Sequence, residues 1–226
     1  MRSLADFEQP QEVFLQAEKL PAFFEDNLVD PARVVKSFPN DTQAHIRIFY
    51  YQYLRLCFEV PNIDYQYYIS HIQGTLNDPN FAIMFPVEDD PSLFNDHQAK
   101  SFIMEFFGIL GEGNTRVLAA LNHFPIMDYI FVCLFRSELL QKGVCQSFDD
   151  YVEREKLLGY LCQEYGVNVE VNGECTIYTD SDTFIYEPAP NDVYLAFIDA
   201  DLAASASVEP VAEPAQQQAQ NIIISK

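Results

Sequence analysis

The chain has 226 residues, of which 49% are hydrophobic, and a formal net charge of -21 at pH 7. This length and composition suit one large globular domain, or one domain with a small appendage, with a buried core. No apolar run reaches the about twenty residues that a membrane-spanning helix needs. Because neutralising phosphates requires cations, the negative charge also argues against direct binding to nucleic acid or to anionic lipid.

Two long segments of the chain contain acids but no cation. No Lys or Arg occurs between Leu56 and Ala99 or between Leu157 and Ser225. Such a surface favours pairing with a basic protein, or lining a path along which nucleic acid passes without binding. The alternative is a charge that only keeps the protein in solution.

Two short helices are predicted near the N-terminus, over residues 11–25 and 31–38. The second begins with Asp30-Pro31, a capping residue followed by proline at the first helical position. Both would belong to a mainly helical body that spans residues 1–166.

The segment 46–60 is ambiguous. Its apolar residues alternate with others such as Arg47 and Arg55, and this period of two favours a long strand. No turn residue interrupts the segment, however, and Asp41-Thr42 can equally cap a helix. We predict a strand, with a helix as the alternative.

The next segment combines a helix, a turn and a short apolar run. The spacing of apolar residues predicts a helix over residues 65–76, followed by a turn at Asn77-Asp78-Pro79-Asn80. Residues 81–85 are consistent with a buried strand. Glu88-Asp89-Asp90-Pro91 then predicts a loop that leads into a new helix.

Residues 91–166 form a predicted helical block. The glycines of Gly111-Glu112-Gly113-Asn114 separate two helices, Pro125 begins another, and Gly143 ends that helix in a left-handed conformation. Ser147 to Asp150 supply a capping residue and acids for a last helix, which extends to Gly166.

After residue 166 the pattern changes from helical to alternating. The segments 167–171 and 174–178 flank Asn172-Gly173, a dipeptide that tolerates the positive φ values of a two-residue hairpin turn. Residues 183–186 and 193–198 would add two further strands. The predicted fold class is therefore α+β, with an antiparallel β-meander over residues 167–200 packed on the helical body.

Residues 201–226 are predicted to form an extended arm. Their Ala, Ser, Pro, Glu and Gln content is too polar to build a core. At the end of this arm, Ile222, Ile223 and Ile224 are typical of a strand that adds to the edge of a partner's sheet. A tail that folds back onto its own sheet is the alternative. We expect these isoleucines, together with the acidic run Glu88, Asp89 and Asp90, to bind a protein partner.

No catalytic motif is present in the sequence. The glycines between Gly108 and Gly113 lack the Lys-Ser/Thr ending of a phosphate-binding loop, and no Gly-x-Ser-x-Gly elbow occurs. Acids two apart on a strand share a face and can hold a divalent cation, but Asp and Ser are also ordinary turn formers. The close acid pairs, which are expected by chance in so acidic a chain, are Asp180 with Asp182, Asp199 with Asp201, and Asp89 with Asp90. We predict no catalytic residue, no cofactor and no metal.

Cysteines and histidines give no metal-binding pattern. The five cysteines are widely spaced without a Cys-x-x-Cys pair, and their odd number without a signal peptide predicts reduced, buried thiols. The histidines do not repeat at metal-ligand spacing, so a zinc site would need ligands from distant parts of the chain. These residues are Cys57, Cys133, Cys145, Cys162, Cys175, His45, His71, His97 and His123.

Together these features favour a non-catalytic, acidic structural or adaptor subunit of a large assembly. A connector or tail-region component of a bacteriophage or other virus particle fits this description, by analogy of class alone. The expected partners are other protein subunits, including further copies of the chain, and the expected location is the cytoplasm or a virus particle. The alternatives are an inhibitor that mimics nucleic acid and an enzyme with an unrecognised site.

Overall fold

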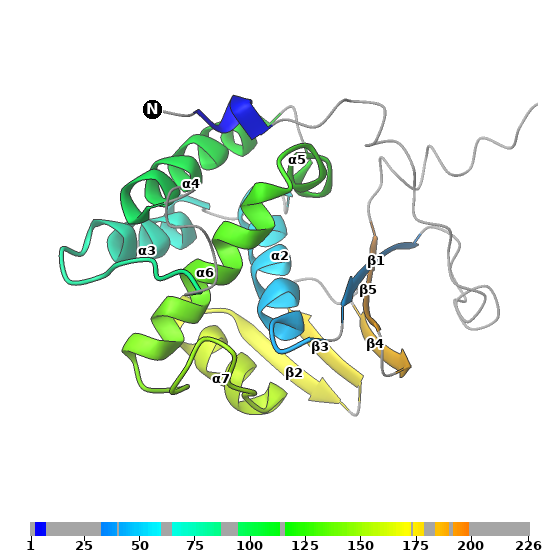
Figure 1. The fold of residues 1–226 in the computed structure, drawn as a ribbon. Helices are drawn as coiled ribbons and strands as arrows, with labels where there is room; N and C mark the ends of the chain where they lie inside the picture. Colours follow the sequence, from blue (N-terminus) through cyan, green and yellow to red (C-terminus); the bar gives the residue numbers. More distant parts are fainter. Residues whose placement is uncertain are drawn as a thin grey trace, which may run out of the picture.

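The computed structural model describes a body of packed helices (Figure 1). These are η1 (Leu4–Phe7), α2 (Ala44–Glu59), α3 (Tyr65–Asn77), α4 (Asp96–Gly111), α5 (Val117–His123), α6 (Ile126–Gln141) and α7 (Arg154–Tyr165). The described residues are 3–7, 33–39, 41–59, 65–86, 95–113, 116–172, 174–178, 184–189 and 192–198, with only the backbone course described in the strands.

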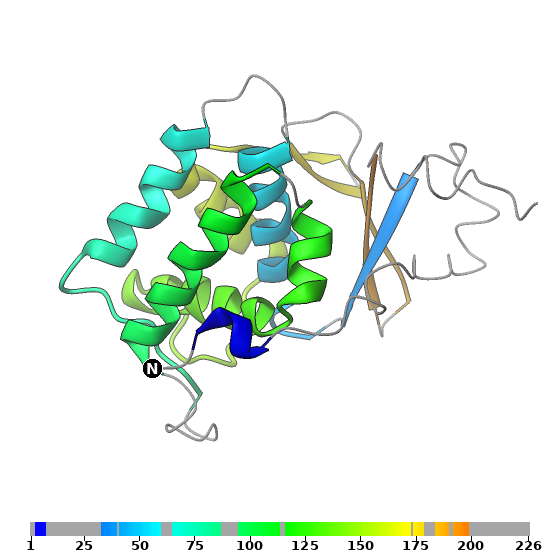
Figure 2. The ribbon, with the colours of Figure 1, turned by 90° about the horizontal axis from the view of Figure 1, so that it is seen from above.

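The centre of this body is α2. It packs against α3, α5, α6 and α7, and the view from above shows it enclosed by other elements (Figure 2). Side chains on every side of α2 are buried, including Phe49, Tyr51 and Leu54. A helix that is buried all round needs apolar residues on all its faces and therefore lacks a clear helical period.

The predicted strand over residues 46–60 is therefore wrong, and the alternative helix is observed. The alternating pattern arose because polar residues such as Gln52 and Arg55 are buried in the core, where they bind other polar groups. Gln52 accepts a hydrogen bond from Arg55, and Arg55 also pairs with Glu59 at 3.1 Å. At the start of the helix, the Oδ1 of Asp41 accepts the N–H of Gln43 at 2.8 Å, which satisfies one of the unpaired donors there.

The predicted helix over residues 31–38 is also wrong. The backbone of β1 (Arg33–Pro39) runs as a strand that pairs antiparallel with β5 (Asp192–Ile198), with Val34 opposite Phe197. Adjacent β-branched residues such as Val34 and Val35 favour strands. The partner strand lies far along the chain, so local pattern does not reveal it. The other predicted N-terminal helix, over residues 11–25, lies outside the described residues.

The predicted C-terminal β-meander and the α+β class built on it are not observed. β2 (Asn168–Asn172) and β3 (Glu174–Tyr178) pair only with each other, whereas β4 (Phe184–Ala189) joins β5 in a second sheet of order β1-β5-β4. In the part of the chain with described side chains, all regular structure is helical and none is strand. The fold class of that part is therefore helical. The predicted arm over residues 201–226 lies outside the described part.

The segment between α3 and α4 follows the sequence prediction only in part. The helix over residues 65–76 and the turn after it are confirmed, and the N–H of Asn80 donates to Asp78 at 2.8 Å. Residues 81–86 form neither a helix nor a strand. Two of their N–H groups bond to side chains, that of Ile83 to Asp96 at 2.7 Å and that of Met84 to Ser137 at 2.8 Å.

The predicted helix boundaries from α5 to α7 are mostly confirmed. Pro125 precedes α6, and Gly143 and Gly166 adopt positive φ values of 69° and 67° after α6 and α7. The last helix, however, begins at Arg154 rather than at residue 147. Ser147 to Asp150 close a separate turn, because the carboxylate of Asp150 accepts both the N–H and the hydroxyl of Ser147.

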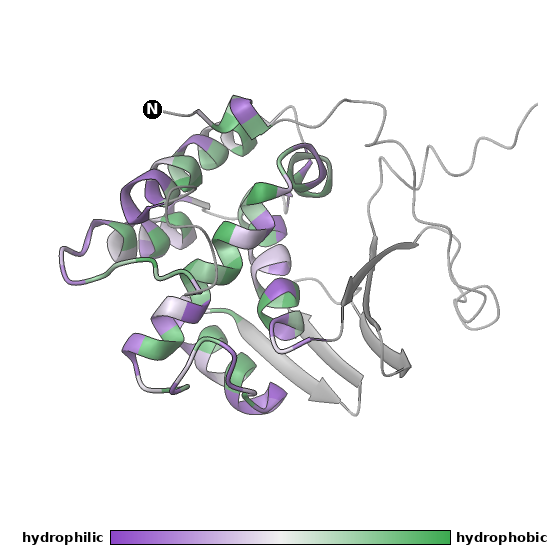
Figure 3. Ribbon diagram, viewed as in Figure 1, coloured by the Kyte–Doolittle hydropathy of each residue, from purple (hydrophilic) through white to green (hydrophobic). Residues whose placement is uncertain are grey.

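Aromatic rings fill the space between α2, α6 and α7. The ring centroids of Phe49, Phe135 and Tyr165 lie 5.4 to 5.6 Å apart, and Tyr53 lies 5.1 Å from Tyr165. The outer helices α3 and α4 carry hydrophilic as well as hydrophobic residues, as amphipathic helices do (Figure 3). Tyr165 of this aromatic cluster also contacts His71 and Glu138, two residues of the candidate site.

No single helix among the described ranges has the length and apolarity needed to cross a membrane. The helices α5 and α6 meet those criteria only as a pair, and the chain bends by 105° between them. Both helices contribute buried residues to the core, including Leu121, Phe131 and Leu134.

The described cysteines are buried, as the sequence predicted. Cys57, Cys133, Cys145 and Cys162 are buried thiols that form no disulfide. Burial raises the pKa of Cys57 to about 12, so that this thiol stays protonated near neutral pH. The side chain of Cys175 lies outside the described part.

Candidate functional site

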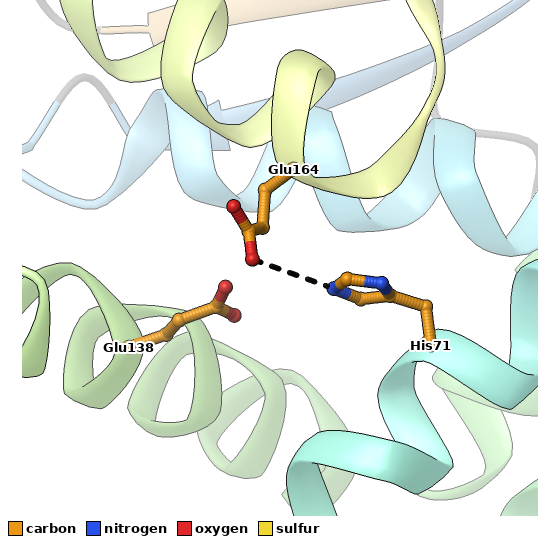
Figure 4. Close-up of side chains that lie close together, drawn as sticks. All are labelled: His71, Glu138 and Glu164. Atoms are coloured by element: carbon orange, nitrogen blue, oxygen red, sulfur yellow. Dashed lines mark ion pairs between the residues drawn. The ribbon is translucent and has the colours of Figure 1, made fainter.

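A cavity of about 370 Å³ opens between α3, α6 and α7. Its polar lining includes His71 from α3, Glu138 from α6 and Glu164 from α7. Figure 4 shows these three side chains pointing toward one another from their separate helices. One potential ligand atom of each lies within 4.8 Å of the others, and His71 Nε2 is 3.9 Å from Glu164 Oε1.

Each of the three side chains is placed by the packing of its helix. Ile72, next to His71, is buried in the core, and the His71 ring lies against Tyr165 with 4.6 Å between the centroids. Glu164 occupies the last turn of α7 beside Tyr165 and is about one-third exposed. Glu138 lies in the stretch of α6 from Ile130 to Leu139, in which every residue is buried.

Glu138 is a buried acid, with 2% of its surface exposed. Burial raises the pKa of Glu138 to about 7, and the charge of Glu164 acts in the same direction. The hydroxyl of Tyr165 donates to Glu138 Oε2 at 2.6 Å, which favours the ionised form but does not offset burial. The charge of Lys142 also favours the ionised form, but the environment of Glu138 as a whole opposes its negative charge.

Two tyrosines surround the carboxylate of Glu138. Burial raises the pKa of Tyr165 and of Tyr160, and the charge of Glu138 raises both further. Both hydroxyls are therefore protonated at neutral pH and able to act as donors. The aromatic cluster around Tyr165 fixes its ring and so determines the direction from which it donates.

Lys142 is the cation at the rim of the cavity. Its Nζ lies 3.8 Å from Glu164 Oε1, and half of its side chain is exposed. No described Lys or Arg comes within 4 Å of Glu138. One half-exposed lysine side chain thus lies beside two carboxylates and an imidazole.

The arrangement is suited to two kinds of chemistry. One imidazole nitrogen and two carboxylate oxygens are a common partial ligand set for a divalent transition metal. An acid that titrates near neutrality beside a histidine is also able to exchange protons with a substrate. Cation binding needs only water to complete the site, whereas proton transfer needs a substrate to act on.

The described cations are largely engaged within the protein. Arg136 is fully buried and donates to Gln43 Oε1 and to the carbonyl of Thr42, both at 3.1 Å. Arg47 pairs with Asp41 at 2.8 Å and with Asp128 at 3.1 Å. The same holds for Arg55 with Glu59, Lys100 with Asp96, and Arg154 with Glu155.

Many of the described acids, in contrast, are exposed and form no ion pair with a described cation. Six of them make no ion pair with any described residue, and they belong to η1, α4, the end of α3 and the segment before α7. They are Asp6, Asp78, Glu105, Glu112, Asp149 and Glu153. The described surface is thus more negative than the composition of that part alone would suggest.

The partner-binding residues predicted from sequence lie outside the described residues. They are Ile222, Ile223, Ile224, Glu88, Asp89 and Asp90, and their roles stay predictions. The close acid pairs of residues 180, 182, 199 and 201, for which no role was predicted, also lie outside the described residues. The sequence reasoning did not find the cluster of His71, Glu138 and Glu164, whose members are widely separated along the chain.

Comparisons with known proteins give no match to this chain, whether with family models, with curated proteins or with solved structures. What His71, Glu138 and Glu164 are able to bind or catalyse is therefore inferred from their geometry and chemistry alone.

Proposed function

We propose that the protein is a non-catalytic, acidic structural or adaptor subunit that docks onto a positively charged protein surface in a larger assembly. The observation that supports this proposal is the separation of charge in the described body. Arg136 and Arg55 are buried and Arg47 is paired, whereas acids such as Glu105 and Glu112 are exposed.

The physical consequence of this separation is long-range attraction of cations. Unpaired exposed carboxylates steer a basic partner toward the surface and raise the rate of encounter, while phosphate backbones are repelled. A second copy of the same acidic surface is repelled as well. The partner at this surface is therefore a different, basic protein.

The distribution of the acids favours docking over mimicry of nucleic acid. Mimicry needs a row of carboxylates along one face. In the described part, Asp6 and Glu105 belong to η1 and α4, whereas Asp149 and Glu153 precede α7 at the other end of the body (Figure 1). This spread suits a broad electrostatic surface better than a single row.

Zero-length carbodiimide cross-linking in a native extract tests the docking proposal, because it joins a carboxylate to a lysine only where the two touch. We expect links from Glu105, Glu112 or Glu153 to lysines of a distinct basic protein, identified by mass spectrometry. Raising the salt concentration to about 0.5 M before cross-linking should abolish the links, since exposed charges are then screened.

Charge variants and nucleic-acid binding provide the controls. The pair Glu105→Gln with Glu112→Gln should weaken capture of the partner, and Glu105→Lys with Glu112→Lys should weaken it further. A truncation after Ser205 tests the predicted arm separately, by size-exclusion chromatography with light scattering. Retention of DNA or RNA by the purified protein at about 0.15 M salt would contradict the proposal.

A further inference from the structure

We propose that His71, Glu138 and Glu164 bind one divalent transition-metal ion of the Zn²⁺ or Mn²⁺ type, and that this ion holds α3, α6 and α7 together. The site is independent of the proposed docking function, because it lies in the cavity between the helices rather than on the acidic surface (Figure 4).

The geometry requires only small movements to accept an ion. Zinc ligands lie about 2.0–2.2 Å from the metal, so neighbouring ligand atoms approach within about 3–3.5 Å of one another. The present atoms are within 4.8 Å. His71 and Glu164 are both about one-third exposed and able to change rotamer, whereas Glu138 is held by the core.

The ligand set selects among cations. Imidazole nitrogen suits Zn²⁺ and other transition metals, and carboxylate suits Mn²⁺ and Zn²⁺. Ca²⁺ and Mg²⁺ prefer six or more oxygen ligands. With three protein ligands on one side of a cavity of about 370 Å³, water is able to fill the remaining positions.

The surroundings of Glu138 provide the support that metal ligands usually have. Tyr165 donates to Oε2 of Glu138 at 2.6 Å, and a carboxylate that accepts such a hydrogen bond is still able to bind an ion. Such outer hydrogen bonds orient a ligand and raise its affinity for metal. Tyr165 itself is fixed by Phe49 and Phe135. A carboxylate held in place by the core therefore faces two side chains that can adjust their rotamers to an ion.

The charged groups at the cavity carry a net negative charge, which favours binding of a divalent cation. Two carboxylates face one ammonium group, that of Lys142, which is 3.8 Å from Glu164 Oε1. Because half of the Lys142 side chain is exposed, it is able to leave for solvent when an ion binds. Lys142 thus competes with the metal, and Lys142→Ala should bind the metal more tightly.

Isothermal titration calorimetry of the full chain tests the site, after removal of bound metal with a chelator. We expect one site for Zn²⁺ or Mn²⁺ that Mg²⁺ and Ca²⁺ do not occupy. His71→Ala and Glu164→Gln should each weaken binding by more than about tenfold, and Tyr165→Phe by at least about tenfold. The metal should raise the melting temperature of the wild type more than that of His71→Ala or Glu164→Gln.

Matched controls separate this site from non-specific binding to an acidic chain. His97→Ala and Glu112→Gln remove an exposed imidazole and an exposed carboxylate from α4 and its end, and both should bind as the wild type does. Cys175→Ser excludes zinc binding by that thiol. Circular dichroism confirms that the variants fold. Equal affinity in the wild type and in His71→Ala, or no stoichiometric binding to the wild type, would overturn the proposal.

Discussion

Charged side chains in the interior of this protein are stabilised to different degrees. Arg136 donates hydrogen bonds to Gln43 and Thr42, and Arg55 pairs with Glu59. Glu138 accepts a hydrogen bond from the hydroxyl of Tyr165, and the charge of Lys142 also favours its ionised form, but neither offsets burial. A buried charge without a counterion destabilises the folded state. Burial without a paired counterion therefore disfavours the charged form of Glu138.

The first prediction concerns the pH dependence of stability. The pKa of Glu138 is about 7 in the folded protein and about 4.3 in an unfolded chain. Its contribution to stability is therefore complete below the lower value and is lost as the pH rises through the higher one. Between about pH 5 and pH 8, the wild type should lose up to about 3 kcal/mol relative to Glu138→Gln.

Urea unfolding in a chelator measures this difference without a bound ion. Glu164→Gln serves as the control, because its carboxylate is partly exposed and its removal should change the pH profile much less. A constant difference between the wild type and Glu138→Gln across this pH range would show that Glu138 is solvated like a surface acid.

The second prediction uses two glycines of opposite character. Gly166 has a φ of 67° at the end of α7, where only glycine is unstrained, whereas Gly159 lies in the middle of the same helix with nothing within 4 Å of an added Cβ. Gly166→Ala should destabilise the protein by about 1 kcal/mol, and Gly159→Ala should stabilise it by about 0.5–1 kcal/mol. Thermal unfolding of the two variants checks the opposite signs.

At the scale of elements, contacts between helices do more than bury apolar surface. Glu59 ends α2, yet its Oε1 accepts the N–H of Val117 at the start of α5, at 2.7 Å. Its other oxygen pairs with Arg55 at 3.1 Å. One side chain therefore caps a neighbouring helix and neutralises a buried cation.

The third prediction separates these two roles of Glu59. Glu59→Ala leaves both Arg55 and the Val117 N–H without this partner and should cost about 3 kcal/mol. Glu59→Gln retains an acceptor for the N–H and should cost clearly less. Chemical denaturation measures both. Equal losses would mean that the charge alone matters and that the cap contributes nothing.

The sequence predicted those elements whose signals are local. The turn at Asp78, the glycine caps at Gly143 and Gly166, and the start of α6 after Pro125 all depend on neighbouring residues, and all are observed. The nature of α2 and β1 depends on distant partners. The apolar residues of α2 show no helical period because the helix is covered on every side, and β1 is specified by its pairing with β5.

The candidate site could not be predicted from the sequence because it also depends on contacts between distant residues. His71, Glu138 and Glu164 come from three helices and are brought together only by packing. One local signal existed, namely the polar group Arg136-Ser137-Glu138 within the otherwise apolar stretch of α6. An acid in such a stretch indicates a buried charge, but it does not identify what faces it.

At the scale of the whole molecule, a net charge of -21 means self-repulsion. The fourth prediction is that stability rises with salt, because screening weakens repulsion between exposed carboxylates. Between about 0.02 and 0.5 M NaCl, the melting temperature should increase by about 3 °C. Glu105→Gln with Glu112→Gln should reduce this increase. A decrease with salt would show that pairs such as Arg47 with Asp41 outweigh the repulsion.

The complete enclosure of α2 has a kinetic consequence. Amide protons in its middle, such as those of Phe49 and Leu54, meet solvent only when the surrounding helices separate. In native-state hydrogen exchange, these amides should therefore exchange at the rate set by opening of the entire molecule. Amides of α3 and α4, which face water on one side, should exchange faster through local fraying. The slowest protons of α2 would then report the global free energy of unfolding without any denaturant.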